Sequence, residues 1–231
     1  MSGAGDRPGR FASPPCLAGE IAPDYFDPLA VDPQQESDVS RWRRAQRENL
    51  LAARTALGAA GREAAAQALM RHLTALLAMA GMGGAGSVVS LYWPIRNEPD
   101  LRPLLADLAR QGVRIALPVV EAAGLPLSFR LWQPGLKLRP DPRGVPAPDT
   151  QAPFVRPDCA IIPALGWDRE GHRLGYGDGA WDRTLAALSP RPLTIGVALA
   201  EGELRTLYPQ PHDVALDLIV TPDGVQLDRR G

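Results

Sequence analysis

Apolar and polar positions follow two different periods along this chain, and together they predict alternating helices and strands. Between about 62 and 80, Leu69, Leu73 and Leu76 recur at helical spacing, which predicts an amphipathic helix with one face toward a core. Further helices are expected at 43–57, 99–110 and 179–188. Short apolar runs predict strands at about 87–92, 113–118, 127–132, 158–163, 193–199 and 216–220. This alternation favours an α/β fold, and we expect a single three-layer α/β/α domain with a mostly parallel sheet.

Two stretches lack a sustained period. Residues 1–37 are rich in Gly, Pro and Asp, so we expect a flexible or surface-docked extension that precedes an α/β domain over 38–231. Residues 134–157 carry repeated prolines and both charge signs, which indicates a long ordered loop near the site.

Composition narrows the function classes without selecting one. The 231 residues are 45% hydrophobic and 22% charged, enough for one core, and the net charge of -1 argues against general nucleic-acid binding. No apolar run reaches membrane-spanning length and no signal-peptide pattern opens the chain, so a cytoplasmic protein is expected. Cys16 and Cys159 lie too far apart to suggest a disulfide framework or a zinc site, and Cys159 is expected in the core.

The most informative stretch is the run 163–183, where an apolar strand enters a glycine-dense loop that opens a helix. Gly175, Gly177 and Gly179 let the backbone aim several N–H groups into one concavity, which attracts anions at a helix N-terminus. Arg173 and Arg183 bracket the loop with donors suited to phosphate oxygens. Asp182 is a hard oxygen ligand of the kind that Mg²⁺ prefers. The simpler alternative is a glycine-rich surface turn with solvated charges.

A basic helix forms a second block. When the residues are placed around a helix at about 100° per residue, the apolar side chains form one sector and the arginines form an adjacent strip. The sector comprises Trp42, Leu50, Ala53 and Leu57, and the strip comprises Arg43, Arg47 and Arg54. We expect the strip to flank the buried face and to present guanidinium groups to a cleft. A solvated helix face is the alternative.

Two further blocks carry carboxylates. In the run 90–101 a strand ends in a polar turn that contains Trp93 and Glu98. Taken alone, Glu98 would suit the first turn of a helix, where the helix dipole favours a carboxylate. In the run 209–222, Asp213 taken alone is a turn residue before a strand.

These four blocks, in this order over residues 43–224, resemble the signatures of the 5-formyltetrahydrofolate cyclo-ligase family, also called 5,10-methenyltetrahydrofolate synthetase. The glycine stretch keeps the Arg-Leu-Gly-Tyr-Gly-x-Gly core and the closing Asp-Arg of the family pattern. It departs from that pattern at Trp167, Asp178, Ala180 and Trp181, and Gly202 stands where the family usually has Gln. Asp178 is unexpected because a carboxylate inside a phosphate nest opposes the anion.

The resemblance implies conversion of 5-formyltetrahydrofolate to 5,10-methenyltetrahydrofolate, with ATP as co-substrate and Mg²⁺ as cofactor. It implies Arg173 and Asp182 as catalytic residues, Asp182 and Asp213 as metal ligands, and Trp93, Glu98, Tyr176, Gly177 and Gly179 as substrate-binding residues. The ATP-binding residues that it implies are Arg43, Arg44, Arg47, Arg173, Leu174, Gly175, Tyr176, Gly177, Asp178, Gly179, Ala180 and Trp181. The expected partners are small molecules only, with neither nucleic acid nor membrane, and the chain is expected to be a monomer or a weak homo-oligomer.

Two alternatives stay open from the sequence. One is a paralogue that uses the same ATP cradle on another substrate, which the departures at Asp178, Ala180 and Gly202 suggest. The other is a non-catalytic nucleotide- or folate-binding module, against which the presence of Asp182, Asp213 and Arg173 counts.

Overall fold

The structure is a computed structural model that describes residues 33–149 and 151–231. Most of the expected N-terminal extension, including Cys16, lies outside the described residues, and 33–37 belong to the first helix. The helices are α1 (Pro33–Ala56), α2 (Gly58–Met79), α3 (Arg102–Arg110) and α4 (Ala180–Ala187), with a short 3₁₀ turn η3 (Ala200–Gly202).

One seven-stranded sheet organises the fold, in the order β11-β10-β9-β6-β1-β2-β3. Its strands are β1 (Val88–Ser90), β2 (Arg114–Val119), β3 (Ser128–Trp132), β6 (Cys159–Pro163), β9 (Leu193–Val197), β10 (Leu218–Thr221) and β11 (Gly224–Asp228). The neighbours from β10 to β2 run parallel, and only the edge strands β3 and β11 are antiparallel to their neighbours. The prediction of a mostly parallel sheet is therefore confirmed.

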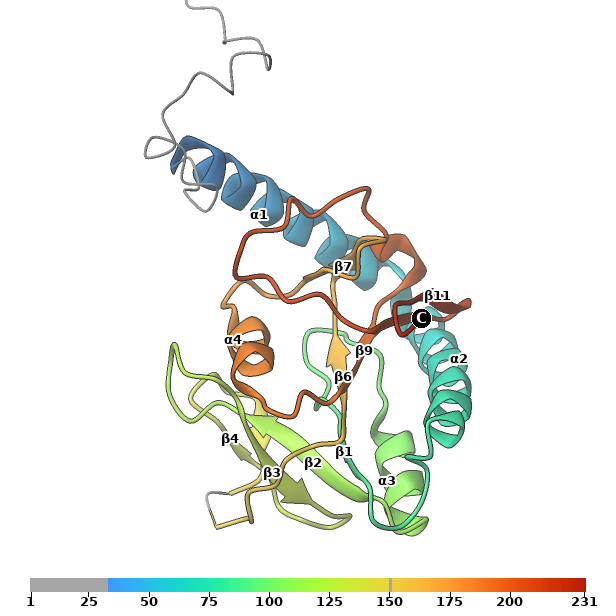
Figure 1. Ribbon diagram of the computed structural model, residues 1–231. Coiled ribbons are helices and arrows are strands. Elements are labelled where there is room, and N and C mark those ends of the chain that lie inside the picture. Colours follow the sequence, from blue (N-terminus) through green and yellow to red (C-terminus); the bar gives the residue numbers. More distant parts are fainter. Residues whose placement is uncertain (1–32, 150) are drawn as a thin grey trace, which may run out of the picture. The chain divides into compact units, whose positions relative to one another are not determined.

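Helices cover both faces of the sheet, as Figure 1 shows. Alternate residues of β6 divide between two cores because successive strand side chains point to opposite faces. Cys159 and Ile161 join the core beneath α2 and α3, whereas Ala160 and Ile162 join the core beneath α4. The expected three-layer α/β/α arrangement is thus the observed one, and Cys159 is a core residue as predicted.

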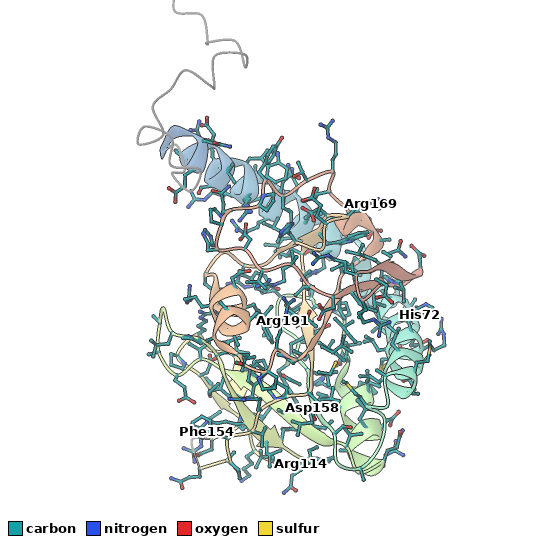
Figure 2. The ribbon with its side chains drawn as sticks, in the orientation of Figure 1. His72, Arg114, Phe154, Asp158, Arg169 and Arg191 are labelled. Atoms are coloured by element: carbon teal, nitrogen blue, oxygen red, sulfur yellow. The ribbon has the colours of Figure 1, made fainter. Side chains whose placement is uncertain are left out.

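The centre of the sheet is a topological switch point. The chain passes from β1 through α3 to β2 on one side, and places β6 on the other side of β1. The segments that leave the carboxyl ends of β1 and β6 therefore diverge, and open α/β sheets bind their ligands in such a place. In Figure 1 the arrow of β6 points toward α1 and β7. In Figure 2, Asp158 and Arg114 mark the opposite, amino end of the strands, far from Arg169.

Several elements differ from the pattern-based expectation. Helix α3 begins at Arg102, not near 99, and Pro103 occupies its first turn, where a missing N–H costs nothing. The loop 134–157 contains a small hairpin of β4 (Arg139–Pro140) and β5 (Pro146–Ala147). Another two-stranded ladder joins β7 (Gly166–Trp167) to β8 (Arg173–Leu174). Two-residue strands are too short to show a period of two, so the pattern does not reveal them.

Candidate functional site

The glycine loop joins β8 to α4 and is shaped by two left-handed glycines. Gly177 has φ 99° and Gly179, the N-cap of α4, has φ 63°. Both are conformations that side chains rarely adopt. A Cβ on Gly177 would also lie 3.0 Å from Cζ of Arg47. Among the described residues, none accepts a hydrogen bond from the backbone N–H groups of 175–179, so these donors are available to a ligand.

The arginines of α1 reach the loops beyond the sheet. Arg43 donates to the carbonyls of Leu207 and Tyr208 at 2.9 and 3.1 Å. Arg47 donates to the carbonyl of Gly175 at 2.8 Å. Burial lowers the pKa of Arg47, and the positive charges of Arg43 and Arg44 lower it further. These side chains therefore form a concentrated positive region against the glycine loop.

The strip of arginines is buried most deeply at Arg54, whereas Arg43 and Arg47 are half-buried. Three residues of the expected apolar sector are half-buried as well, namely Trp42, Leu50 and Leu57. Arg54 is 3% exposed, whereas Ala53, expected in the apolar sector, is exposed. Backbone carbonyls of other segments accept from the guanidinium groups, which offsets the cost of burying these polar side chains. A helical wheel that ranks only hydrophobicity does not predict the burial of Arg54, because it does not include these long-range acceptors.

A buried hydrogen-bonded chain joins α1, the glycine loop and the turn after β1. The Tyr176 hydroxyl donates to Glu98 at 2.8 Å, and Arg54 donates to the Tyr176 oxygen at 3.3 Å. The second carboxylate oxygen of Glu98 accepts from the Ile95 N–H at 2.9 Å. Arg96 lies 4.9 Å above the Tyr176 ring. Glu98 and Tyr176, both predicted to bind substrate, thus lie side by side at the switch point.

The electrostatics of this chain follow from burial. Glu98 is 6% exposed, and burial raises its pKa, although the Ile95 N–H and the Tyr176 hydroxyl favour the charged form. Burial and the nearby charge of Glu98 both raise the pKa of Tyr176, so its phenol stays protonated and donates. The turn that carries Glu98 includes Arg96 and Asn97 at φ 48° and 60°, a strained conformation of the kind that clusters at functional sites.

Two carboxylates predicted to bind metal are each held by an arginine. Arg173 is bidentate to Asp182, with both contacts at 3.1 Å. Asp213 accepts from Arg43 at 2.5 Å and from the Gln210 N–H at 2.7 Å. Burial lowers the pKa of Arg173, and the Asp182 charge opposes that effect. Burial alone would raise the pKa of Asp213, but the hydrogen bonds from Arg43 and Gln210 outweigh this effect and lower the pKa.

The two carboxylates are also linked through the backbone. Oδ1 of Asp182 accepts from the N–H of Val214 at 3.0 Å, and Val214 directly follows Asp213. The structure therefore brings these residues, 31 positions apart in sequence, to one edge of the glycine loop.

The unexpected carboxylate of Asp178 has a partner from a distant loop. Oδ1 of Asp178 accepts from the N–H of Ala180 at 3.1 Å, and Oδ2 forms an ion pair with Arg143. Arg143 stands at the tip of the β4–β5 hairpin, whose turn is closed by hydrogen bonds from Arg143 N and Val145 N to Asp141. The long loop 134–157 therefore supplies a cation that neutralises Asp178 within the glycine loop.

Comparison with known proteins decides the family. The sequence profile of the 5-formyltetrahydrofolate cyclo-ligase family matches residues 39–222. The chain belongs to this family. The resemblance drawn from the four blocks is confirmed, and with it the expectation that the chain is an enzyme of the cyclo-ligase family.

Relatives and solved structures agree with this assignment. A 5-formyltetrahydrofolate cyclo-ligase of Mycolicibacterium smegmatis is 35% identical over 183 residues, which cover 76% of this chain and 91% of that protein. The Escherichia coli cyclo-ligase is 31% identical over 144 residues, 59% of this chain and 79% of that protein. The structure of Aquifex aeolicus 5,10-methenyltetrahydrofolate synthetase superposes with a TM-score of 0.69 at 26% identity, over 82% of this chain and 93% of that one. The structure of the Mycoplasma pneumoniae 5,10-methenyltetrahydrofolate synthetase superposes with a TM-score of 0.63 at 25% identity, over 78% of this chain and 98% of that one.

Not every residue implied by the family resemblance points a side chain at the glycine loop. Leu174 is 1% exposed and Ala180 is 2% exposed, so they line the loop from within the core. Trp181 packs against Phe129 at 6.1 Å between ring centroids. Arg44 is exposed on α1. Leu174, Ala180 and Trp181 therefore contribute to the loop mainly through their backbone, and no hydrogen bond or ion pair among the described residues joins Arg44 to it.

The structure also shows what surrounds Trp93, predicted to bind substrate, and Gly202, which stands where the family usually has Gln. Trp93 lies 6.2 Å from Trp132, ring to ring, with Arg102 5.5 Å above it. Gly202 is buried, and a Cβ there would lie 2.8 Å from the carbonyl oxygen of Leu165, so the Gln usual in the family does not fit this backbone.

Sequence reasoning missed two residues of this candidate site. Arg54 was assigned to the helical strip but not to the site, although its spacing from Arg43 and Arg47 already placed it on their face. Arg143 had no local signal, because its partner Asp178 is 35 positions away in the sequence. In the described part of the chain, no helix is long and apolar enough to cross a membrane.

Proposed function

We propose that this chain, through the domain at 38–231, converts 5-formyltetrahydrofolate to 5,10-methenyltetrahydrofolate with ATP as co-substrate and Mg²⁺ as cofactor. It would act on small molecules in the cytoplasm, as a monomer or weak homo-oligomer. One observation carries the proposal: the buried carboxylate of Glu98 accepts from Tyr176 of the glycine loop. A group suited to a pterin and a loop suited to phosphates therefore lie next to each other at the switch point.

The pterin side is preorganised. The amino-pyrimidine edge of a pterin presents N–H donors, and a carboxylate in a low-dielectric setting accepts them strongly. Glu98 is already fixed by the Ile95 N–H and the Tyr176 hydroxyl, so little entropy is lost when a ligand binds. Trp93, like Glu98, lies in the segment that follows β1, and it would supply an apolar wall for the pterin ring.

The nucleotide side combines backbone donors with cations. The N–H groups of 175–179 would take phosphate oxygens at the N-terminus of α4. Arg47 contacts this loop from α1, Arg43 of the same helix is held at Asp213, and Arg173 directly precedes the loop on β8. Guanidinium groups suit phosphoryl transfer because the reaction needs positioning and charge neutralisation more than covalent help from the protein.

Asp182 and Asp213 would hold Mg²⁺. Their oxygens are hard donors, and each carboxylate has lone pairs beyond those taken by its arginine. Mg²⁺ bound there would neutralise charge on the phosphates and keep part of its water shell. The arginines would meanwhile keep the carboxylates in place.

The proposed chemistry activates a poor leaving group. The formyl oxygen attacks the γ-phosphorus of ATP, so an O–P bond forms, the bond to the β-phosphate oxygen breaks and ADP departs. The neighbouring folate nitrogen then attacks the formyl carbon, loses its proton, and phosphate leaves with the former formyl oxygen. The protein's residues orient the two reactants and neutralise phosphate charge, and no side-chain nucleophile is required.

The deciding experiment follows the absorbance of methenyltetrahydrofolate after purified protein is mixed with 5-formyltetrahydrofolate, ATP and Mg²⁺. We expect a signal that disappears when either ATP or Mg²⁺ is omitted. Folded protein that binds ATP but gives no signal would contradict the proposal and direct the search to another acceptor, as a paralogue with the same ATP cradle would require. Tight binding of both ligands without turnover would instead indicate a binding module.

A further inference from the structure

Arg54 is a buried charge without a carboxylate partner. Its side chain comes from the last turn of α1, is 3% exposed, and donates to the Ala164 carbonyl at 3.0 Å and to the Tyr176 hydroxyl oxygen at 3.3 Å. Its Nε is buried and has no hydrogen-bond partner among the described residues. No ion pair joins Arg54 to a described carboxylate either, whereas buried Arg130 is paired with Glu121 at 3.0 Å.

A buried charge without a carboxylate partner lowers the stability of the fold, so its presence calls for a functional reason. An ionised side chain loses its hydration on burial, and only hydrogen bonds and charge partners offset that loss. An apolar residue at position 54 would avoid the loss, so packing alone gives no reason for an arginine. What the arginine supplies, and an apolar residue lacks, is a positive charge with two fixed donors.

Those donors act on the chain that ends at Glu98. Because the Tyr176 oxygen accepts from Arg54, its own proton is directed away, and it is donated to Glu98 at 2.8 Å. The bond to the Ala164 carbonyl fixes Arg54 to the segment that leaves β6. Arg54 is thus attached to the exit of β6 and, through Tyr176, to the turn after β1.

We propose that Arg54 is a positioning residue which holds the Tyr176 hydroxyl against Glu98, and so couples the glycine loop to the carboxylate that recognises the folate. The proposal deepens the function proposed above and rests on it. Binding of phosphates at the glycine loop would then act on the pterin side through Tyr176, which belongs to that loop.

The surroundings of Glu98 make the pH dependence of folate binding a sensitive readout. We call the low-pH side of that profile, where binding is lost as Glu98 becomes protonated, its acid limb. The charged and titratable groups around it are Arg54, Arg96, Tyr92 and Tyr176. The two arginines favour its ionised form, and burial opposes it. Tyr92 is engaged elsewhere, since its hydroxyl donates to the Pro99 carbonyl at 2.9 Å. Loss of Arg54 therefore makes Glu98 easier to protonate, and folate binding should fail at a higher pH than in the wild type.

The test compares Arg54→Met, Tyr176→Phe and the double variant with Arg130→Met, which removes an equally buried arginine from β3. We expect Arg54→Met to raise KM for 5-formyltetrahydrofolate about tenfold, the usual size for a lost charge-assisted hydrogen bond. KM for ATP should change much less. Tyr176→Phe should act similarly, and the double variant should be little worse than either, since both break one chain. In Arg130→Met the acid limb should stay in place.

A purely structural role would look different. If Arg54→Met lowers the melting temperature but leaves the KM ratio and the acid limb as they are in Arg130→Met, the proposal is wrong. Additive losses in the double variant would also overturn it. Should Arg54→Met fail to fold, Arg54→Lys keeps the charge and loses the forked geometry, and an unchanged KM for 5-formyltetrahydrofolate in that variant overturns the proposal.

One readout does not depend on turnover. The pKa of Glu98 in the ligand-free protein, followed by ¹³C NMR of the side-chain carboxyl, should rise in Arg54→Met and stay unchanged in Arg130→Met. This holds even if the wild type proves inactive on 5-formyltetrahydrofolate, in which case the proposed function fails but the coupling through Tyr176 is still tested. An unchanged pKa in both variants overturns the coupling.

Discussion

The two sides of the site solve the problem of charge in different ways. On the side proposed to bind phosphates, three carboxylates each have an arginine partner: Asp182 with Arg173, Asp213 with Arg43, and Asp178 with Arg143. On the pterin side Glu98 has no ion-pair partner among the described residues and is held by neutral donors. In the proposed function, the first arrangement would keep the cations in place until a polyphosphate binds. The second keeps one acceptor fixed in a dry setting, where a hydrogen bond is strong.

The opposite pKa directions reflect this contrast. Hydrogen bonds from Arg43 and Gln210 outweigh burial and lower the pKa of Asp213 below its ordinary value of 3.8. Burial raises the pKa of Glu98 above its ordinary value of 4.5. A paired carboxylate thus stabilises the fold, whereas the unpaired one is retained at a cost in stability. The following predictions test this difference.

The largest effect is expected from Arg173→Met. It removes a nearly buried guanidinium that pairs with Asp182 and would face the phosphates, so we expect activity to fall about a thousandfold or more. Steady-state kinetics measure the loss. Arg169→Met, in the turn between β7 and β8 and 73% exposed, is the matched control and should stay near wild type. Activity of Arg173→Met within a few-fold of wild type would remove Arg173 from the site.

Asp182→Asn should come next, with a loss of about a hundredfold that additional Mg²⁺ partly restores. The amide keeps the shape of the side chain but is a weaker metal ligand and a weaker partner for Arg173. A Mg²⁺ titration of the rate measures this, with Asp107→Asn on the exposed side of α3 as the control. Full activity of Asp182→Asn at low Mg²⁺ would exclude a metal role.

Glu98→Gln should separate stability from function. KM for 5-formyltetrahydrofolate should rise about thirtyfold, since the charged acceptor is lost. Above its raised folded pKa, ionised Glu98 costs stability, and this cost disappears as pH falls below its ordinary value. The melting temperature at pH 7 should therefore rise by about 2–4 °C, with a gain that shrinks toward pH 4.

Asp213→Asn is the opposite case. Its lowered pKa contributes stability above the ordinary value, and that contribution is lost as pH falls through the folded pKa. The variant should melt below wild type at pH 7 and approach it near pH 3. If both variants shift the melting temperature in the same direction, the contrast between the two sides is wrong.

The smallest effect should come from Arg143→Ala. It leaves the Asp178 carboxylate unpaired beside the phosphates, but the ion pair is partly exposed, so KM for ATP should rise only about fivefold. Asp178→Asn in the same chain should restore it. Arg139→Ala, on the same hairpin and paired with Asp149, should have no effect. No recovery in the double variant would show that Arg143 acts other than by neutralising Asp178.

The sequence was sufficient where short-range patterns carry the information. Leucines at helical spacing predicted α2, apolar runs predicted the strands of the parallel sheet, and alternate glycines predicted the left-handed turns at Gly177 and Gly179. The order of the four blocks indicated the family that the comparisons confirm. Helix periods, strand hydrophobicity and glycine conformations are local properties, so they can be recognised without knowing the fold.

Only the tertiary structure decided how these parts meet. Arg54 and Tyr176 are 122 positions apart, Tyr176 and Glu98 are 78 apart, and Arg43 and Asp213 are 170 apart. A buried arginine is acceptable on the inner face of α1 because carbonyls and hydroxyls of distant segments accept from it. The sequence by itself therefore determined the main helices, the parallel strands and the family of this protein. The pairing of its charges was decided by tertiary structure, because the acceptors that make each buried charge tolerable are brought together only by the fold.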